Sequence, residues 1–376
     1  MGDMSIFPQE KGISRLRLFI FSPHLIGWRI ERATFPFMFL GLLWASLMVA
    51  TTTACREKPY ILLDIPPQPI PSPDGYFQDV AWLEPGVLAL EHLATPDTAN
   101  WDTKLMILYI DTREYYLLPD EVPPACNETR YGRMSRLPNG FFGYLKECLP
   151  SQGIARDFRM HQWDQATQTD LELYRYPIPF EATAFSFDND MERWLQEQSG
   201  DGLFNMLYLV EIGEDPVRVL ENSFARVGEP WWMPDGRILF AGTPGIPQTS
   251  GNLFSGMPGI TVGLREPWNI YLTSLSSLVD GTVEEEQIIL SGVRYINEVK
   301  ASPNGEVITF LGTVEGEEGL WALKVDNGEL VRLWGGFGPY DWSPEGNELV
   351  VLVREPNAEF FYGKPARITL PDSLLN

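Results

Sequence analysis

A short recurring unit, in which a tight turn precedes an apolar strand, most constrains the fold of this chain. Its clearest copies are "VKASPNGEVITFLGT" from Val299, "YDWSPEGNELVVLV" from Tyr340 and "PWWMPDGRILFAG" from Pro230. Proline presets φ and Gly or Asn tolerates positive φ, so the P-x-G core predicts a turn between two strands. The turn positions are Pro85, Pro138, Asp188, Pro234, Pro303 and Pro344. Repeated units with room for four short strands each are typical of the blades of a β-propeller.

We therefore predict an all-β fold, a six-bladed β-propeller with four-stranded blades over residues 77–376. The last unit has only three strands before the chain ends at Asn376. A spare apolar segment, Tyr60 to Ile65, precedes the first unit. We expect it to supply the outer strand of the sixth blade, beside residues 366–370, because an open edge there would favour aggregation.

Several strings resemble the repeats of TolB-type, WD-repeat-like β-propellers. They are "SPNG", "SPEG", "MPDG", "GLWALKVDNGELVRL" (319–333) and "LMILYIDTREYYLL" (105–118). The resemblance extends over nearly all of residues 77–376 and implies the fold rather than a function, because propellers host many activities. TolB has an additional N-terminal α/β domain, which we do not expect here, so the role of TolB itself is not implied.

The N-terminal residues predict export and a lipid anchor. Basic residues precede an apolar run from Phe35 to Ala50, followed by small residues and Cys55. This order is typical of a signal peptide cleaved before a cysteine that receives acyl chains. Two alternatives stay open: a plain signal peptide, and an uncleaved anchor, for which the run is short. Thr52 stands where Leu is usual, and the long polar lead leaves open a true start further downstream.

The predicted organisation is a signal peptide over residues 1–54, a lipidated N-terminus with closing strand and proline-rich linker over 55–76, and the propeller over 77–376. Removing the leader would take five basic and three acidic residues and shift the formal net charge from −23 to −25. Such an acidic chain lacks the Lys and Arg clusters that nucleic acids and anionic lipids require. We expect a monomer outside the cytoplasm, held on a membrane by its lipid at the cell surface or in the periplasm.

The remaining cysteines suggest one disulfide. Cys126 and Cys148 are the only cysteines after Cys55, and an even pair in an oxidising compartment predicts a bridge. Two cysteines without a C-x-x-C motif or a histidine pair do not provide a zinc site. We predict no metal and no cofactor. His92 and His161 are interpreted as ordinary strand or loop residues, and no known catalytic motif is found, so no catalytic residue is assigned.

Loops on one rim are the predicted recognition surface. An insertion at 243–267 is rich in Gly and Pro yet carries apolar side chains, and long loops in compact domains are often functional. Its alternative is a loop that folds over its own propeller. The candidate contacts in these loops are Trp101, Leu253, Phe254, Met257, Arg265, Phe360, Phe361 and Tyr362. For the last three, the start of a strand is an equally weighted alternative.

Two functions compete. The first is a membrane-anchored binding or scaffolding module for a protein, peptide or glycan. The second is a metal-dependent hydrolase or lyase with its site at the mouth of the propeller channel. Convergence of three or more carboxylates, or of the histidines, at one end of the channel would favour the enzyme, whereas a channel lined by unrelated apolar and hydroxyl residues would favour the binding module.

Overall fold

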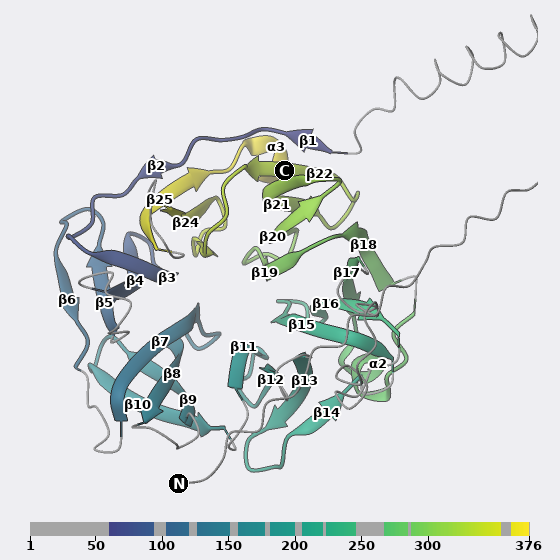
Figure 1. Cartoon of the computed structure of the whole chain (residues 1–376), viewed down its shortest axis with the longest axis horizontal. Helices are drawn as coiled ribbons and strands as arrows, with labels where there is room; N and C mark the ends of the chain where they lie inside the picture. Colours follow the sequence, from purple (N-terminus) through teal and green to yellow (C-terminus); the bar gives the residue numbers. More distant parts are fainter. Residues whose placement is uncertain are drawn as a thin grey trace, which may run out of the picture. The chain divides into compact units, whose positions relative to one another are not determined.

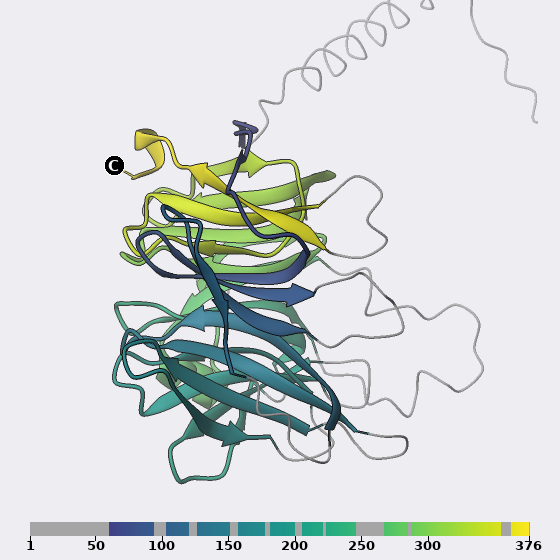
Figure 2. The ribbon, with the colours of Figure 1, turned by 90° about the vertical axis from the view of Figure 1, so that its left-hand side faces the viewer.

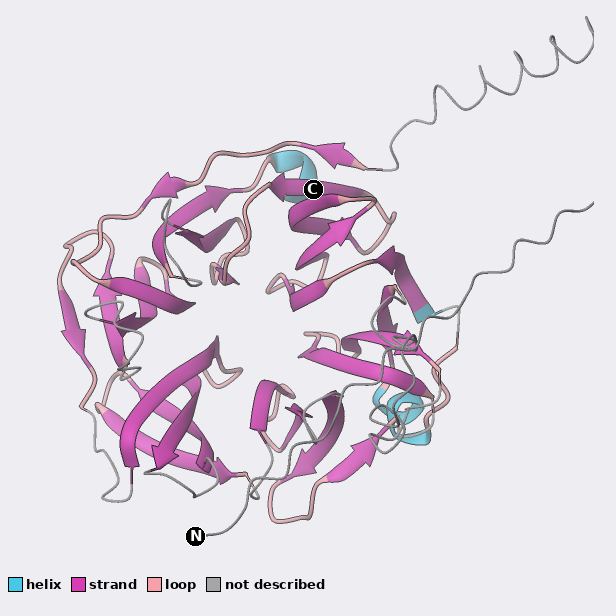
Figure 3. Ribbon diagram, viewed as in Figure 1, coloured by secondary structure: helices cyan, strands magenta, loops and turns pink. Residues whose placement is uncertain are grey.

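Antiparallel sheets are arranged around a central axis, with the first strand of each repeat innermost (Figure 1). The computed structural model describes residues 60–93, 103–119, 126–150, 157–176, 181–199, 205–220, 223–245, 267–284, 287–354 and 362–375. They belong to one compact unit, Pro59–Asn376. Strands dominate it (Figure 3), and the helices labelled in Figure 1, α2 (Leu275–Asp280) and α3 (Asp372–Leu375), are short. The predicted leader lies outside the described residues.

Three sheets are blades of four consecutive strands. The first contains β7 (Cys126–Arg136), β8 (Phe142–Pro150), β9 (Asp157–Asp164) and β10 (Thr169–Arg175). The second contains β11 (Glu181–Phe187), β12 (Arg193–Ser199), β13 (Asn205–Glu211) and β14 (Val217–Val219). The third contains β15 (Phe224–Trp232), β16 (Ile238–Pro244), β17 (Trp268–Thr273) and β18 (Ile288–Val293), with α2 (Leu275–Asp280) between its last two strands.

A fourth blade carries one strand more. It contains β19 (Ile296–Ala301), β20 (Val307–Val314), β21 (Glu317–Lys324) and β22 (Leu330–Trp334), and β1 (Ile61–Leu62) is added to β22 as a parallel strand. The remaining strands form one eight-stranded sheet. Its members are β2 (Gln68–Pro69), β3 (Tyr76–Glu84), β4 (Val87–Leu93), β5 (Lys104–Tyr109), β6 (Tyr115–Leu117), β23 (Tyr340–Trp342), β24 (Glu348–Arg354) and β25 (Gly363–Thr369), and α3 (Asp372–Leu375) follows β25.

The structure confirms an all-β propeller with four-stranded blades. Four blades are separate sheets, one of which carries the additional strand β1. The predicted turns are also present, because each lies between the first and second strands of its repeat. In two of them a serine hydroxyl closes the turn: Ser302 accepts the Val307 N–H at 3.0 Å and Ser343 that of Glu348 at 3.1 Å. In the third repeat Asp188 takes this serine's place and accepts the Glu192 N–H. Asn189, and not Asp188, therefore stands where the other turns have proline.

Apolar clusters fill the space between neighbouring blades, so both faces of a blade are covered. In β20 the run Val307, Ile308, Phe310 and Leu311 is almost fully buried, and Trp321 of β21 is completely buried. The Trp321 indole N–H donates to the Gly312 carbonyl at 3.1 Å. Continuous apolar runs, rather than strict alternation, are the expected sequence of strands buried on both faces.

The closing segment was predicted at the wrong blade. Tyr60 to Ile65 does not pair with residues 366–370; Ile61 pairs with Val331 of β22 instead, and only Ile65 packs against the apolar cluster that contains Ile368. The N-terminal strand that pairs with β25 is β2, Gln68–Pro69, within the proline-rich segment taken for a linker. Side-chain packing explains the choice, since the Tyr60 ring packs edge-on against Trp321, with 5.2 Å between ring centroids. Arg332 of β22 also holds the Asp64 carboxylate at 2.8 Å.

The described part of the chain contains no helix with the length and hydropathy needed to cross a membrane.

Candidate binding site in the channel

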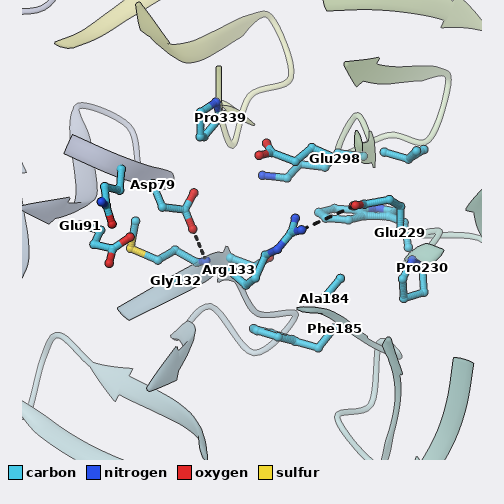
Figure 4. A pocket seen from close by; sticks show the side chains of 16 residues that line it. Asp79, Glu91, Gly132, Arg133, Ala184, Phe185, Glu229, Pro230, Glu298 and Pro339 are labelled. Carbon is cyan, nitrogen blue, oxygen red and sulfur yellow. Dashed lines mark hydrogen bonds and ion pairs between the residues drawn. The ribbon is translucent and has the colours of Figure 1, made fainter. Parts of the chain in front are cut away.

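Three inner strands share the same irregularity. Each contains a β-bulge, and the first residue of the bulge has a left-handed backbone: Arg133 in β7 (φ 50), Glu229 in β15 (φ 52) and Glu298 in β19 (φ 50). A non-glycine residue in this region costs roughly 1–3 kcal/mol, and such strain clusters at functional sites. The bulges direct three charged side chains toward the axis, as Figure 4 shows.

These side chains border a cavity of about 450 Å³, which we call the channel cavity. Its wall is formed by residues of β3, β4, β7, β11, β15 and β19, together with Pro339 before β23 (Figure 4). The charged groups on this wall are Asp79, Glu91, Arg133, Glu229, Glu298 and Lys300. Phe185 and Trp231 supply apolar surface. Four carboxyl groups therefore face two cations in a confined space.

The two cations have different surroundings. Lys300 donates to the Tyr340 carbonyl at 2.6 Å and to Asp341 Oδ1 at 3.1 Å, and its side chain is 12% exposed. Arg133 is 34% exposed, and its guanidinium lies 3.6 Å from Glu229 Oε1. Lys300 is thus fully engaged with the neighbouring strand, whereas Arg133 extends into the cavity with a looser ion pair.

Several acids of the channel also join neighbouring inner strands. Asp79 of β3 accepts the Met134 N–H of β7 at 3.1 Å. Glu298 of β19 accepts the Tyr340 N–H at 3.2 Å. An innermost strand has one edge without a strand partner, and its N–H groups need other acceptors when buried. The acids therefore have a structural role in addition to any role in binding.

Carboxylates accept backbone N–H groups of inner strands at other places around the ring as well. Asp341 of β23 accepts the Trp82 N–H of β3 at 2.8 Å, and Glu197 of β12 accepts the Glu229 N–H at 2.7 Å. This last bond fixes the backbone of Glu229 at its left-handed φ. The close approach also requires Gly228, because a Cβ there would lie 2.8 Å from the Glu197 carboxylate.

Two carboxyl groups of the channel cavity bind protons unusually tightly. Burial raises the pKa of Glu91 to about 8, and the charge of Asp79 adds to the shift. Burial raises the pKa of Glu298 to about 7, although Lys300 and Arg133 oppose the shift. Glu91 is therefore mainly protonated at neutral pH, so the cavity is less negative than its composition suggests.

A second cavity of about 400 Å³ adjoins the first and shares Ser135, Phe185 and Trp231 with it. Turn prolines form much of its wall: Pro138, Pro234, Pro303 and Pro344. Four tryptophans are also among its lining residues: Trp82, Trp231, Trp232 and Trp342. The repeated turns therefore surround an aromatic cavity, while the bulges surround a charged one.

Most of the predicted site residues cannot be placed. Those outside the described residues are Cys55, Trp101, Leu253, Phe254, Met257, Arg265, Phe360 and Phe361. Tyr362 is described, and its prediction as an exposed contact is wrong. It is 3% exposed, and its ring packs against Tyr76 at 5.9 Å between centroids. It directly precedes β25, which matches the alternative of a strand start, and packing against β3 explains its burial.

The two cysteines of the predicted disulfide lie on paired strands. Cys126 is paired with Pro150 and Cys148 with Thr129 in the β7–β8 hairpin. This register makes them diagonal neighbours, whose Cα atoms are typically about 7–8 Å apart, with the Cβ atoms closer. The bridge itself stays a prediction, since the Cys126 side chain is outside the described residues.

Neither His92 nor His161 lines the channel cavity. His161 of β9 contacts Asp170 through Nδ1 at 3.0 Å and stacks on Tyr144, within the body of its blade. His92 of β4 contacts the Asp74 carbonyl at 3.1 Å. Within the described ranges, no group of three or more His, Cys, Asp or Glu residues is arranged to hold a metal ion.

The sequence analysis missed the charged residues of the channel, although a signal for them exists. The residue five positions before the turn proline, or before Asn189, lines the channel cavity in five repeats. These residues are Arg133, Ala184, Glu229, Glu298 and Pro339. A charged residue in an inner strand, repeated at one offset from the turn, would have identified three of them.

No protein-family model matches the chain, and no curated protein matches its sequence. Among solved structures, TolB from Acinetobacter baumannii is similar with a TM-score of 0.53 and 16% identity, over 76% of this chain and 61% of TolB. An alpha-L-arabinanase from Penicillium chrysogenum, solved with arabinobiose, is similar with a TM-score of 0.53 and 13% identity, over 81% and 97% of the two chains. The chain thus spans less than two thirds of the TolB chain. At these identities the similarity establishes the β-propeller fold alone.

Proposed function

We propose that this chain is an exported, lipid-anchored propeller that binds a protein, peptide or glycan by receiving a positively charged group in the channel cavity. The observation that carries the proposal is the convergence of Arg133, Glu229 and Glu298 on one cavity from strained positions in three blades. Strain of this kind persists only where the surrounding structure fixes it, and it favours a site formed in advance of its ligand.

The chemistry of the wall favours a cation with N–H donors. Glu229 and Glu298 are acceptors, and Glu229 remains 13% exposed beside Arg133. Arg133 already occupies part of the space with a guanidinium, and Phe185 and Trp231 offer apolar surface for a carbon stem. Lysine or arginine side chains and amino sugars have these features. Charge-assisted bonds of this kind are about twice as strong as neutral ones.

We also propose that the ring has six blades. The eight-stranded sheet then consists of two blades, β2 with β23–β25, and β3–β6. The strands that join them, β25 and β3, share the single residue pair Gly363–Phe77, whereas β24 and β25 share seven pairs. If the boundary between the two blades is placed at this single pair, each of the six repeats forms one blade. A rigid closed ring is suited to presenting a preformed channel.

Membrane attachment through Cys55 is the remaining part of the proposal. The variant Cys55→Ser should leave the protein unprocessed or release it from membranes. Intact mass of the membrane-extracted protein should show acyl chains on Cys55 and no residues before it. Membrane retention of the variant, with no acyl mass on the wild type, would refute the anchor.

Capture from native membranes tests the channel. Glu229→Gln and Glu298→Gln each remove one carboxylate charge from the cavity, and Glu214→Gln, on the exposed β13–β14 turn, makes the same change elsewhere. We expect the channel variants to lose captured partner at least tenfold and the control to retain it, with circular dichroism showing that all three variants are folded. Equal capture by all three folded variants would exclude the channel cavity as the site.

A metal-dependent hydrolase or lyase remains the second candidate. The observation in its favour is the convergence of four carboxyl groups, Asp79, Glu91, Glu229 and Glu298, on the channel cavity, which is the arrangement expected of the enzyme. Two of them, Glu91 and Glu298, have raised pKa values that suit acid–base catalysis. Calorimetric titration with Mn²⁺ or Ca²⁺ separates the two functions. Binding at micromolar metal that Glu229→Gln abolishes would favour the enzyme, and its absence the binding module.

A further inference from the structure

The outer edge of the fourth blade carries an unusual apolar strand. Three consecutive residues of the closing segment are exposed: Ile61 (47%), Leu62 (38%) and Leu63 (42%). Other outer strands expose fewer apolar side chains: β6 exposes Tyr115 (52%) and Leu117 (46%), and β10 and β14 expose Leu171 and Val217, each at 55%. A run of three exposed apolar residues is disfavoured on a free surface unless it serves a function.

This strand is firmly held on one side and open on the other. Leu63 N–H donates to the Arg332 carbonyl at 3.0 Å, and Ile65 N–H to the Leu333 carbonyl at 2.7 Å. Tyr60 fixes its start against Trp321. β1 is the terminal strand of its sheet, so among the described residues its far edge has no strand partner. The apolar residues are therefore presented rigidly.

The covalent chain places this edge close to the proposed lipid. Cys55 lies five residues before Tyr60, so their Cα atoms are within about 18 Å of each other even in a fully extended chain. The intervening residues include Arg56 and Lys58 against one acid, Glu57, although the whole chain has a net charge of −23. The segment between Cys55 and β1 is thus not acidic, and the two acids bound at this edge, Asp64 and Glu317, both pair with Arg332.

We propose that Ile61, Leu62 and Leu63 rest on the bilayer in which the acyl chains of Cys55 are inserted. The inference rests on the proposed lipid anchor. β1 lies on the circumference of the ring and away from the inner strands in both views (Figures 1 and 2). Contact at β1 orients the ring edge-on to the membrane, so that the channel axis is roughly parallel to the bilayer. Both ends of the channel then remain accessible to a partner beside the membrane.

Depth-dependent fluorescence quenching tests the contact on the full lipidated protein. A fluorophore is attached to Leu62→Cys or, as the matched control, to Leu171→Cys, also an exposed apolar residue of an outermost strand. Each protein is reconstituted in phosphatidylcholine vesicles that contain nitroxide-labelled lipid. We expect the label at position 62 to be quenched at least twofold more than the label at position 171. Equal quenching of the two labels would overturn the proposal.

Further measurements distinguish a failure of the lipid anchor from a failure of the edge contact. Acyl mass on Cys55 and co-flotation with vesicles are measured first; if both are absent, the lipid anchor itself is refuted. If both are present and the labels are quenched equally, only the edge contact is refuted. Self-quenching at position 62 that grows with protein density, without nitroxide lipid, would show that a second copy covers β1 and would also overturn the proposal.

Discussion

Lys300 of β19 and Asp341 of β23 form a buried ion pair between neighbouring repeats, with Nζ 3.1 Å from Oδ1. The side chains are only 12% and 7% exposed. The second oxygen of Asp341 accepts the Trp82 N–H from β3, so one carboxylate connects three inner strands. The pair therefore lies at the closure of the ring.

Lys300→Met should destabilise the fold strongly, because it leaves the buried Asp341 carboxylate without its cation. Breaking a buried pair in this way typically costs about 3–5 kcal/mol. Urea unfolding at pH 7 measures the effect. The control is Arg237→Met, which breaks an exposed pair with Asp235 (46% and 50% exposed), where we expect less than about 1 kcal/mol. Similar losses in both variants would contradict the role in ring closure.

Gly346→Ala should destabilise the rim of turns. Gly346 has φ 74, and a Cβ there would lie 3.2 Å from Pro303 of the preceding turn. The matched control is Gly328→Ala, since Gly328 has a similar φ of 71 with nothing within 4 Å. Both variants carry the backbone cost of roughly 1–2 kcal/mol, and only Gly346→Ala adds the clash. A melting temperature of Gly346→Ala equal to that of the control would mean that the turns do not interlock.

Stability should fall as the pH rises, through Glu91. In the folded protein the carboxyl group of Glu91 has a pKa of about 8, whereas in the unfolded protein its pKa is near the ordinary value of 4.5. The stabilisation is complete below pH 4.5 and is lost as the pH rises toward 8, at up to roughly 1.4 kcal/mol per pH unit. Glu91→Gln should flatten this part of the stability profile, measured by urea unfolding between pH 5 and 8.5. An unchanged slope would show that Glu91 is ionised in the fold.

Tyr60→Ala should lower the free energy of unfolding by about 3 kcal/mol, the usual cost of truncating a buried aromatic side chain, because it loosens the closing segment. Tyr60 is 8% exposed and packs on Trp321, whereas Leu63, three residues later, is 42% exposed. Leu63→Ala should change stability by less than about 0.5 kcal/mol. Thermal unfolding of both variants provides the comparison, and equal effects would argue that this segment does not secure the blade.

Cys126 and Cys148 should be linked in protein recovered from an oxidising compartment. Closing a loop of about 20 residues stabilises by roughly 3 kcal/mol in the chain-entropy model, so Cys148→Ala should lose a similar amount. Intact mass after alkylation, with and without prior reduction, reports the bridge. Two alkylated cysteines without reduction would disprove it.

The turns and strands were predictable because their causes are local. "SPNG" and "SPEG" place glycines at positive φ and serines where they close the turn, and continuous apolar runs follow. The propeller fold follows from repeating these local signals. The position of Tyr362 was not predictable, because burial against β3 depends on a strand far away in sequence.

The sequence by itself determined the repeat, the hairpin turns and the four-stranded blade, since these depend on backbone conformation and apolar patterning within about 40 residues. Only the tertiary structure decided which strand closes which blade. Tyr60 joins β22 because its ring fits against Trp321, a contact between residues far apart in the chain. The charged channel was likewise decided in three dimensions. Arg133, Glu229 and Glu298 meet there because bulges in separate blades turn them toward one axis.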